Sequence, residues 1–252
     1  ARFPDSYHLI ALDTVDSTNE DAKRRIKGGA LPGTVVWARQ QTAGRGRRGR
    51  PWSSPPGNLY LSLAVQPKRP WTDAAQLSFL AGVVVAETVA AHLPSKCRIT
   101  LKWPNDVLVE GAKVSGVLLE GENDPGGEAP WVIVGIGLNV ESSPVDTLYP
   151  ATHLERERPD VCDLTVLCGV LISCWADWYA RWEAIGFSII RTAWLDRAHN
   201  FNGDIIAKLP NETIEGRFVD LDVNGELVLE TREGRTMIIN AADIYFPAAR
   251  SM

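Results

Sequence analysis

The most constraining stretch of this sequence is residues 131–140, WVIVGIGLNV. The side chains of a strand alternate between its two faces. Every second residue from 132 to 140 is a branched apolar one, so this face is predicted to belong to the core. The opposite face carries Gly135 and Gly137, which leave a strip of bare backbone. A flat ligand fits against such a strip, but a bend of the strand or a closely packed helix explains the two glycines equally well.

The patterns around this strand predict an α+β domain. Strand and helix patterns are interleaved, which indicates a mixed β-sheet with helices packed on one face. Helices are predicted from a start at residues 16–20 to residue 28, and at 73–93, 164–187 and 188–199. Strands are predicted at 8–13, 34–41, 58–66 and 99–103, and as a hairpin at 107–109 and 113–122.

The pattern changes after residue 202. Short strand patterns at 204–209, 213–220, 226–231 and 236–240 are separated by turn residues, including an Asn224-Gly225 pair that is typical of a tight hairpin. We therefore expect a small antiparallel barrel at this end. The 252 residues are enough for one large domain with an appendage. The predicted domains are residues 1–201 and residues 202–252.

Composition excludes several classes of protein. Hydrophobic residues make up 45% of the chain and charged residues 23%, which excludes global disorder. No apolar run reaches the roughly 18 residues of a membrane helix, and no signal peptide is visible. The four cysteines and four histidines are scattered and include no Cys-x-x-Cys pair. We predict no protein-bound metal, and free buried thiols in a reducing compartment.

Positive charge is concentrated in one part of the chain. The formal net charge is −5, yet residues 22–72 hold eleven Lys or Arg and no Asp or Glu. The densest part is GRGRRGR at residues 44–50, the arginine loop, which repels itself and favours an anion as partner. A nucleotide phosphate and a DNA backbone both fit. No Gly-Lys-Ser/Thr follows, so this is not a Walker loop, whereas Arg48-Gly49-Arg50-Pro51 matches the core of an AT-hook.

Two further segments place polar groups beside predicted strands. Lys102-Trp103-Pro104-Asn105-Asp106 closes a strand, a position that suits a pocket, although Pro-Asn-Asp is also ordinary turn chemistry. Lys113 opens the apolar segment KVSGVLLE. It is either a functional cation or an edge charge that hinders aggregation. Neither segment decides between these interpretations alone.

Together the motifs resemble those of the biotin protein ligases. In the order of that family, the chain contains Ser17-Thr18-Asn19, the segment from Gln41 through the arginine loop to Trp52, Lys102-Trp103-Pro104-Asn105-Asp106, KVSGVLLE at 113–120 and Gly135-Ile136-Gly137-Leu138-Asn139. The resemblance covers nearly the whole chain, and the joint pattern is highly specific. It implies a catalytic domain similar to that of class II aminoacyl-tRNA synthetases, followed by a small SH3-like β-barrel.

The resemblance also implies a two-step reaction in the cytoplasm. Biotin and MgATP give biotinyl-5′-AMP and pyrophosphate. A lysine of the biotin carboxyl carrier domain of acetyl-CoA carboxylase, or of a related carboxylase, then attacks the adenylate and releases AMP. The expected partners are therefore biotin, ATP with its Mg²⁺, and the carrier domain. A homodimer is compatible with the family, whereas no membrane and no DNA partner are expected.

Roles for individual residues follow from the same resemblance. Lys113, Arg47 and Asp106 are the catalytic candidates. Lys113 would contact the biotin carboxylate and the α-phosphate, Arg47 would hold phosphates, and Asp106 would orient or deprotonate the carrier lysine or instead serve the nucleotide. The biotin site is implied to contain Ser17, Thr18, Asn19, Gln41, Gly44, Arg45, Lys113, Gly116, Gly135 and Gly137. The ATP and adenylate site is implied to contain Arg47, Arg48, Arg50, Trp52, Lys102, Asn105 and Lys113.

Two other functions remain as alternatives. A lipoate or octanoate ligase uses the same kind of scaffold, but such relatives generally lack the arginine loop and the Lys-Trp-Pro-Asn-Asp segment. An AT-rich DNA binder using Arg48 to Pro51 conflicts with the negative net charge and with a loop that lies between two strands.

The sequence departs from the family at two places. The ligase pattern begins by Leu9, so we expect the form without the N-terminal DNA-binding domain of the repressor members. Residues 241–244 are Ala-Ala-Asp-Ile, where the family often shows Gly-Glu-Val. No role for a single residue of the barrel is predicted for this reason.

Overall fold

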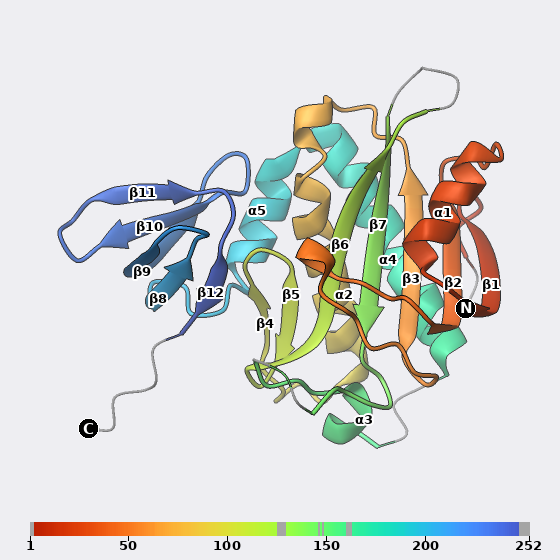
Figure 1. The fold of residues 1–252 in the computed structure, drawn as a ribbon, viewed down its shortest axis with the longest axis horizontal. Helices are drawn as coiled ribbons and strands as arrows, with labels where there is room; N and C mark the ends of the chain where they lie inside the picture. The colour runs from red at the N-terminus through yellow and green to blue at the C-terminus, as the bar shows by residue number, and fades with distance from the viewer. Residues whose placement is uncertain (1–2, 125–129, 146, 148, 160–162, 247–252) are drawn as a thin grey trace.

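The computed structural model of the chain describes residues 3–124, 130–145, 147, 149–159 and 163–246 (Figure 1). A seven-stranded sheet with its helices forms the larger part, and a five-stranded antiparallel sheet lies at one end. The mixed sheet and the separate C-terminal sheet are both confirmed. No helix among the described residues is long and apolar enough to cross a membrane.

The large sheet is mixed because β1 and β2 run parallel while its other neighbouring strands are antiparallel. The spatial order β1-β2-β3-β7-β6-β5-β4 puts β7, the strand with two glycines, in the centre. The predicted hairpin joins β5 to β6 through Glu110 and Gly111, whose φ angles are 49° and 80°. The strands are β1 His8–Val15, β2 Thr34–Gln41, β3 Leu59–Val65, β4 Ile99–Lys102, β5 Asp106–Val109, β6 Ala112–Glu122 and β7 Trp131–Leu138.

One face of this sheet packs on a layer of three helices. The face of β7 that was predicted to be core, including Val134 and Ile136, lies in the same buried cluster as Leu80 and Val84 of the apolar helix α2. Helix α2 packs on the sheet, and α4 and α5 both contact it. The three helices are α2 Gln76–His92, α4 Leu164–Ile185 and α5 Phe187–Leu195.

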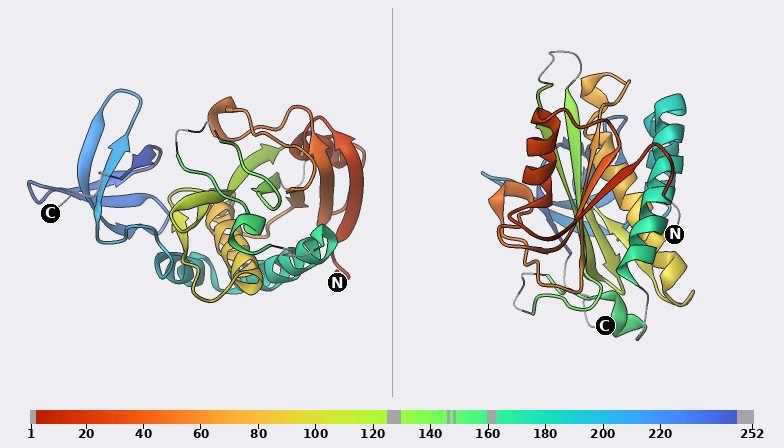
Figure 2. Two further views of the ribbon diagram at one scale, coloured as in Figure 1. Left: turned by 90° about the horizontal axis from the view of Figure 1, so that it is seen from below. Right: turned by 90° about the vertical axis from the view of Figure 1, so that its right-hand side faces the viewer.

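The prediction that the helices cover only one face was wrong for α1, Thr18–Lys27. Ala22 and Ile26 of α1 are buried on the opposite face against Val36 and Ile133. Figure 2 shows α1 and the α2–α4 layer on opposite sides of the sheet. The physical reason is that β2 and β3 carry apolar residues at consecutive positions, so both of their faces have to be covered.

The C-terminal unit is an antiparallel sheet with the strand order β11-β10-β9-β8-β12. Four strands lie where they were predicted, and Asn224-Gly225 lies in the turn between β9 and β10, with Gly225 at a φ of 85°. The fifth strand, β12, was missed because three residues are too few for an alternating pattern to show. The strands are β8 Asp204–Lys208, β9 Thr213–Leu221, β10 Leu227–Thr231, β11 Thr236–Ile239 and β12 Asp243–Tyr245.

Three single helical turns lie in the connections: η1 Arg47–Gly49, η2 Trp71–Asp73 and α3 Leu154–Glu157. The first of them is the tip of the arginine loop. Cys97, Cys168 and Cys174 are free thiols, but only Cys168 is buried, whereas buried thiols were predicted. Cys162 lies outside the described residues.

Phe79 of α2 connects the two sheets. Its ring packs edge-on against Phe187 and Trp194 of α5, with ring centroids 5.5 and 5.6 Å apart. Gly225 of the C-terminal sheet approaches so closely that an added Cβ would lie 2.5 Å from the Phe79 ring. Trp103 also donates a hydrogen bond of 3.0 Å to the Gly225 carbonyl. The C-terminal sheet is therefore docked on an aromatic cluster.

We predict that Phe79→Ala lowers the free energy of unfolding by roughly 3–5 kcal/mol, the usual cost of deleting a buried ring. Val166→Ala is the control, because Val166 is 42% exposed. It should change the free energy by less than about 0.5 kcal/mol. Urea unfolding followed by tryptophan fluorescence measures both variants. A free energy of unfolding of Phe79→Ala equal to that of Val166→Ala would show that the aromatic cluster contributes little to docking.

Candidate active site

A cavity of about 750 Å³ lies on the face of the large sheet that also carries α1. Its walls come from α1, the β2–β3 connection with the arginine loop, the β4–β5 turn, β6, β7 and the C-terminal sheet. All residues predicted for the site line this one cavity: Ser17, Thr18, Asn19, Gln41, Gly44, Arg45, Arg47, Arg48, Arg50, Trp52, Lys102, Asn105, Asp106, Lys113, Gly116, Gly135 and Gly137.

Glycines form the floor of the cavity. A Cβ added to Gly137 would lie 2.6 Å from the indole ring of Trp52, and one added to Gly135 would lie 2.3 Å from Asn19 Oδ1. Gly116 of β6 pairs with Gly137, and a Cβ there would lie 3.2 Å from both Trp52 and Lys113. Side chains from α1 and from the segment after the arginine loop therefore lie in close contact with the bare backbone of β7.

Uncharged polar groups line the end of the cavity next to α1. Gln41 Oε1 accepts hydrogen bonds from the backbone N–H of Thr18 at 2.8 Å and from its hydroxyl at 3.1 Å. Gln41 Nε2 donates to Ser54 Oγ at 2.9 Å. Ser62 Oγ lies 2.8 Å from Thr18 Oγ1. Ser17 is the N-cap of α1, but its side chain makes no capping hydrogen bond. This end offers hydroxyl and amide groups to a polar, uncharged ligand.

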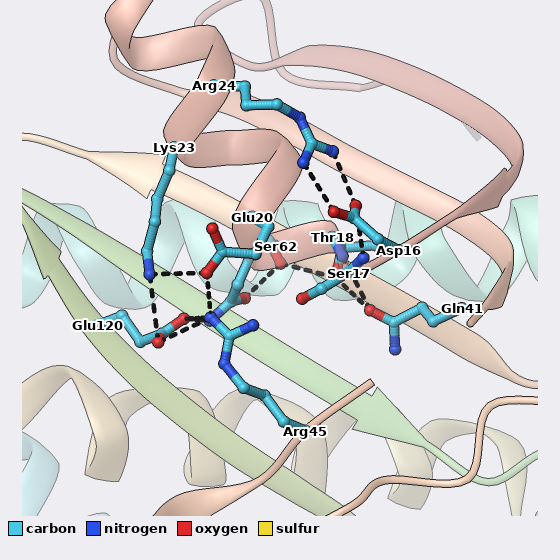
Figure 3. A network of polar contacts seen from close by, with 11 residues as sticks. Asp16, Ser17, Thr18, Glu20, Lys23, Arg24, Gln41, Arg45, Ser62 and Glu120 are labelled. Carbon is cyan, nitrogen blue, oxygen red and sulfur yellow. Dashed lines mark hydrogen bonds and ion pairs between the residues drawn. The ribbon is translucent and has the colours of Figure 1, made fainter. Parts of the chain in front are cut away.

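Arg45 closes this end through a cluster of charges (Figure 3). Its guanidinium bonds to Glu120 of β6 at 2.8 and 2.9 Å and also to Glu20 of α1. Asn19 Nδ2 donates to Glu120 Oε2 at 2.8 Å, and Lys23 lies 3.3 Å from the same carboxylate. Burial raises the pKa of Glu120, but the hydrogen bonds from Arg45 and Asn19 outweigh this and hold the pKa below its usual value.

The tip of the arginine loop lies toward the other end of the cavity. Arg48 and Gly49 both have positive φ angles, 56° and 70°, and Gly46 N–H donates to the Arg50 carbonyl at 2.7 Å. Arg47 Nη1 donates to Asn105 Oδ1 at 3.3 Å. Burial lowers the pKa of Arg47, and so does the neighbouring charge of Arg48. A partly buried guanidinium of this kind gains free energy from an incoming anion.

Lys113 and Asp106, which both line the cavity, form an ion pair with 2.6 Å between Lys113 Nζ and Asp106 Oδ1. The lysine ammonium also lies 5.3 Å from the centre of the Trp52 ring. Both residues are on paired strands, because Asp106 of β5 is in register with Gly116 of β6. The ion pair holds the ammonium in place above the glycine floor.

Lys102 at the end of β4 is 6% exposed, and its ammonium lies 3.3 Å above the Tyr149 ring. The Phe246 ring is 5.4 Å away. Burial, together with the charge of Lys113, lowers the pKa of Lys102 to about 8, against the opposing effect of Asp106. The cavity thus has a cationic end, formed by Lys102, Lys113 and the arginine loop tip, and a neutral polar end.

Comparison with known proteins agrees with this geometry. The sequence model of the biotin/lipoate A/B protein ligase family matches residues 11–139, and that of the biotin protein ligase C-terminal domain matches residues 204–246. The biotin–(acetyl-CoA-carboxylase) ligase of Paracoccus denitrificans is 37% identical over 242 residues, which cover 93% of this chain and 99% of that protein. The chain belongs to the biotin protein ligase family.

Two further relatives support the assignment. The bifunctional ligase/repressor BirA of Bacillus subtilis is 33% identical over 93% of this chain and 73% of its own length. The structure of the Aquifex aeolicus biotin protein ligase in complex with biotin and ATP superposes with a TM-score of 0.82. It is 29% identical and covers 95% of this chain and 99% of its own. The protein is thus an ATP-dependent ligase by its family.

Sequence reasoning missed several residues around the cavity of this ligase. Glu20 and Glu120 were not predicted, although both lie inside or beside quoted motifs, because a carboxylate partner for Arg45 cannot be recognised from local pattern. Tyr149 and Asp243, which were not predicted either, line the cavity itself. The signal for Asp243 was present, since residues 242–244 hold an acidic residue where the family motif has one. Among the described residues, no cluster of His, Cys, Asp or Glu is arranged to hold a metal ion.

The lowered pKa of Lys102 generates a prediction for the ligase. A phosphate bound nearby favours the ammonium form, so ATP binding at about pH 8.5 should take up on the order of half a proton. Lys102→Arg keeps the charge at every pH and should abolish this uptake. Calorimetric titrations in buffers of different ionisation enthalpy measure it. Equal uptake by both proteins would place the titrating group elsewhere.

Proposed function

We propose that the cavity binds biotin and ATP side by side, joins them to biotinyl-5′-AMP and passes biotin to a lysine of a carboxylase carrier domain. The observation that carries this proposal is the uneven distribution of polar and charged groups along this cavity. Hydroxyl and amide groups gather next to α1, and Lys102, Lys113 and Arg47 gather at the far end. Such a gradient suits an acyl substrate with a neutral head and a carboxylate tail that faces a nucleotide phosphate.

The cationic side chains of the cavity reduce the electrostatic repulsion between the two substrates in the first step. A carboxylate and an α-phosphate are both anions, and their approach in a cavity of low effective dielectric is repulsive by several kcal/mol. Lys113 Nζ is already held 2.6 Å from Asp106, so it needs little rearrangement when the substrates arrive. In the proposal Lys113 bridges the biotin carboxylate and the α-phosphate, and Arg47 holds the phosphates. The carboxylate oxygen attacks the α-phosphorus, and pyrophosphate leaves.

The neutral end is assigned to the ureido ring of biotin. Ser17, Thr18 and Gln41 supply hydroxyl and amide groups, and Asn19 lies over Gly135. Arg45 and Gly44 would cover this end, because Arg45 is already tied to Glu20 and Glu120. Gly116, Gly135 and Gly137 would form the floor beneath the adenylate.

The cationic end is assigned to the nucleotide. Trp52 would pack on adenine and Asn105 would hydrogen-bond at the adenine side, with Arg48, Arg50 and Lys102 near the phosphates. Mg²⁺ would arrive as part of the ATP substrate. In the second step Asp106 would orient the carrier lysine or accept its proton, a role supported by its ion pair with Lys113, the residue assigned to the biotin carboxylate. Service to the nucleotide is the alternative for Asp106.

The architecture belongs to the same proposal. We assign residues 1–201 to a catalytic domain similar to class II aminoacyl-tRNA synthetases and residues 202–252 to an SH3-like barrel. The five-stranded sheet that starts at Asp204 supports this division. We also place the reaction in the cytoplasm, where carboxylase carriers and ATP are both available.

Pyrophosphate exchange into ATP tests the first step. Exchange should depend on biotin and not on lipoate, and added duplex DNA should leave it unchanged. Lys113→Ala should reduce exchange more than about tenfold, because the carboxylate and the phosphate would meet without the bridging ammonium. Circular dichroism serves as the control for folding. Near-normal exchange in the variant would remove Lys113 from this role, and exchange supported by lipoate would favour the second ligase function.

Arg47→Ala tests whether the loop retains the intermediate. We predict a folded protein that loses its biotinyl-5′-AMP faster than the wild type by about tenfold or more, since the half-buried cation assigned to the phosphate is removed. Gel filtration of the preformed complex, followed by quantification of bound adenylate over time, gives the rate. Equal retention by both proteins would count against closure by the loop.

A further inference from the structure

The arginines of the loop are divided between two anchors. Arg45 is bound to Glu20 and Glu120 next to α1. Arg48 and Arg50 both bind Asp243, with Nη–Oδ2 distances of 3.3 and 2.6 Å. Among the described residues, no carboxylate lies within ion-pair distance of Arg47, which bonds only to the amide of Asn105. Carboxylates therefore hold the loop on both sides of Arg47. The guanidinium of Arg47 stays available to bind an anion.

Asp243 belongs to the C-terminal sheet and is fixed there by its neighbours. Its backbone lies opposite Lys208 in the antiparallel pairing of β12 with β8, and the residues on either side, Ala242 and Ile244, are buried. The Ile244 carbonyl also accepts a hydrogen bond of 2.8 Å from the Tyr149 hydroxyl. The carboxylate therefore projects from a rigid strand into the cavity wall.

The loop tip, by contrast, has little packing of its own. None of the residues of η1, Arg47–Gly49, is buried. The side chains of Arg48 and Arg50 are 44% and 57% exposed, whereas that of Asp243 is 24% exposed. Segments with few buried contacts open at low free energy unless something tethers them. The ion pairs with Asp243 are the contacts that tie this tip to the other sheet.

The charges leave the tip attractive to phosphate. One carboxylate compensates only one of two guanidinium groups, so Arg48 and Arg50 together remain net positive in the presence of Asp243. Burial raises the pKa of Asp243, but the hydrogen bond from Arg50 and the charges of the loop arginines outweigh it and hold the pKa below its usual value. Asp243 is therefore ionised near neutral pH, where it can hold both guanidinium groups.

We propose that Asp243 is a positioning residue through which the C-terminal sheet holds the tip of the arginine loop over the nucleotide end of the cavity. The tether consists of protein groups alone, the two guanidinium groups and the Asp243 carboxylate. Its effect on the loop is independent of the reaction, while its effect on the adenylate rests on the proposed function. Removal of the carboxylate frees the tip, and the bound adenylate then escapes or hydrolyses faster.

Hydrogen exchange of the ligand-free protein tests the tether directly. In Asp243→Asn, amides of residues 44–52 should exchange at least about threefold faster than in the wild type, with the C-terminal sheet unchanged. Asp220→Asn is the matched control, because Asp220 also joins the C-terminal sheet to the large unit, through Arg191 of α5, at a place that touches no loop residue. Asp243→Glu keeps the charge and should restore most of the protection.

Salt provides a second measurement. Partly exposed ion pairs are screened, so raising NaCl from about 0.05 to about 0.5 M should accelerate exchange at residues 47–50 more in the wild type than in Asp243→Asn, which keeps only the Arg45 ion pairs of the loop. Adenylate retention should fall at least about threefold in Asp243→Asn and remain normal in Asp220→Asn.

The results that would refute the tether can be distinguished from those that would refute the proposed function. Unchanged loop exchange in Asp243→Asn, or faster exchange throughout the C-terminal sheet, would show that Asp243 is no tether of the loop. A lower KM for ATP in this variant would also overturn it, because Asp243 would then be a competitor of phosphate. Faster loop exchange in a protein that never forms an adenylate would instead leave the tether standing and refute the function.

Discussion

Four guanidinium groups within seven residues repel one another, and a loop that carries them folds only where the rest of the chain supplies negative charge. In this protein the compensation comes from three distant elements: Glu20 of α1, Glu120 of β6 and Asp243 of β12. The loop consequently spans the cavity from its neutral end to its cationic end. The position of the loop, and with it the shape of the binding cavity, depends on these ionic contacts.

The large sheet provides the rigid counterpart to this loop. The apolar side chains of β7 face the helical core, and its glycines face the cavity. One face of this strand therefore stabilises the fold, while the other leaves room for a ligand. Lys113 and Asp106 stand on neighbouring hydrogen-bonded strands beside it. Charges that are fixed on strands before substrate arrives stabilise a developing charge without paying for reorganisation.

Local chemistry was sufficient to predict much of this fold. The hairpins at Glu110-Gly111 and Asn224-Gly225 each contain a glycine that adopts a positive φ, and the inward face of β7 follows from alternation. The site residues were found because they cluster in short motifs that resemble one family. The position of α1 was not predictable, since consecutive apolar residues in a strand do not say which element covers each face. The pairing of Arg48 with Asp243 spans 195 residues, and no local pattern encodes such a contact.

The glycine floor also limits how the pocket could be re-engineered. At Gly137 not even a methyl group fits beside Trp52, and glycine is already the smallest residue, so β7 offers nothing that can be trimmed. Room for a bulkier ligand above β7 would have to come from replacing Trp52, which lies over Gly137, or Asn19, which lies over Gly135. The width of the cavity above β7 is therefore set by residues outside this strand.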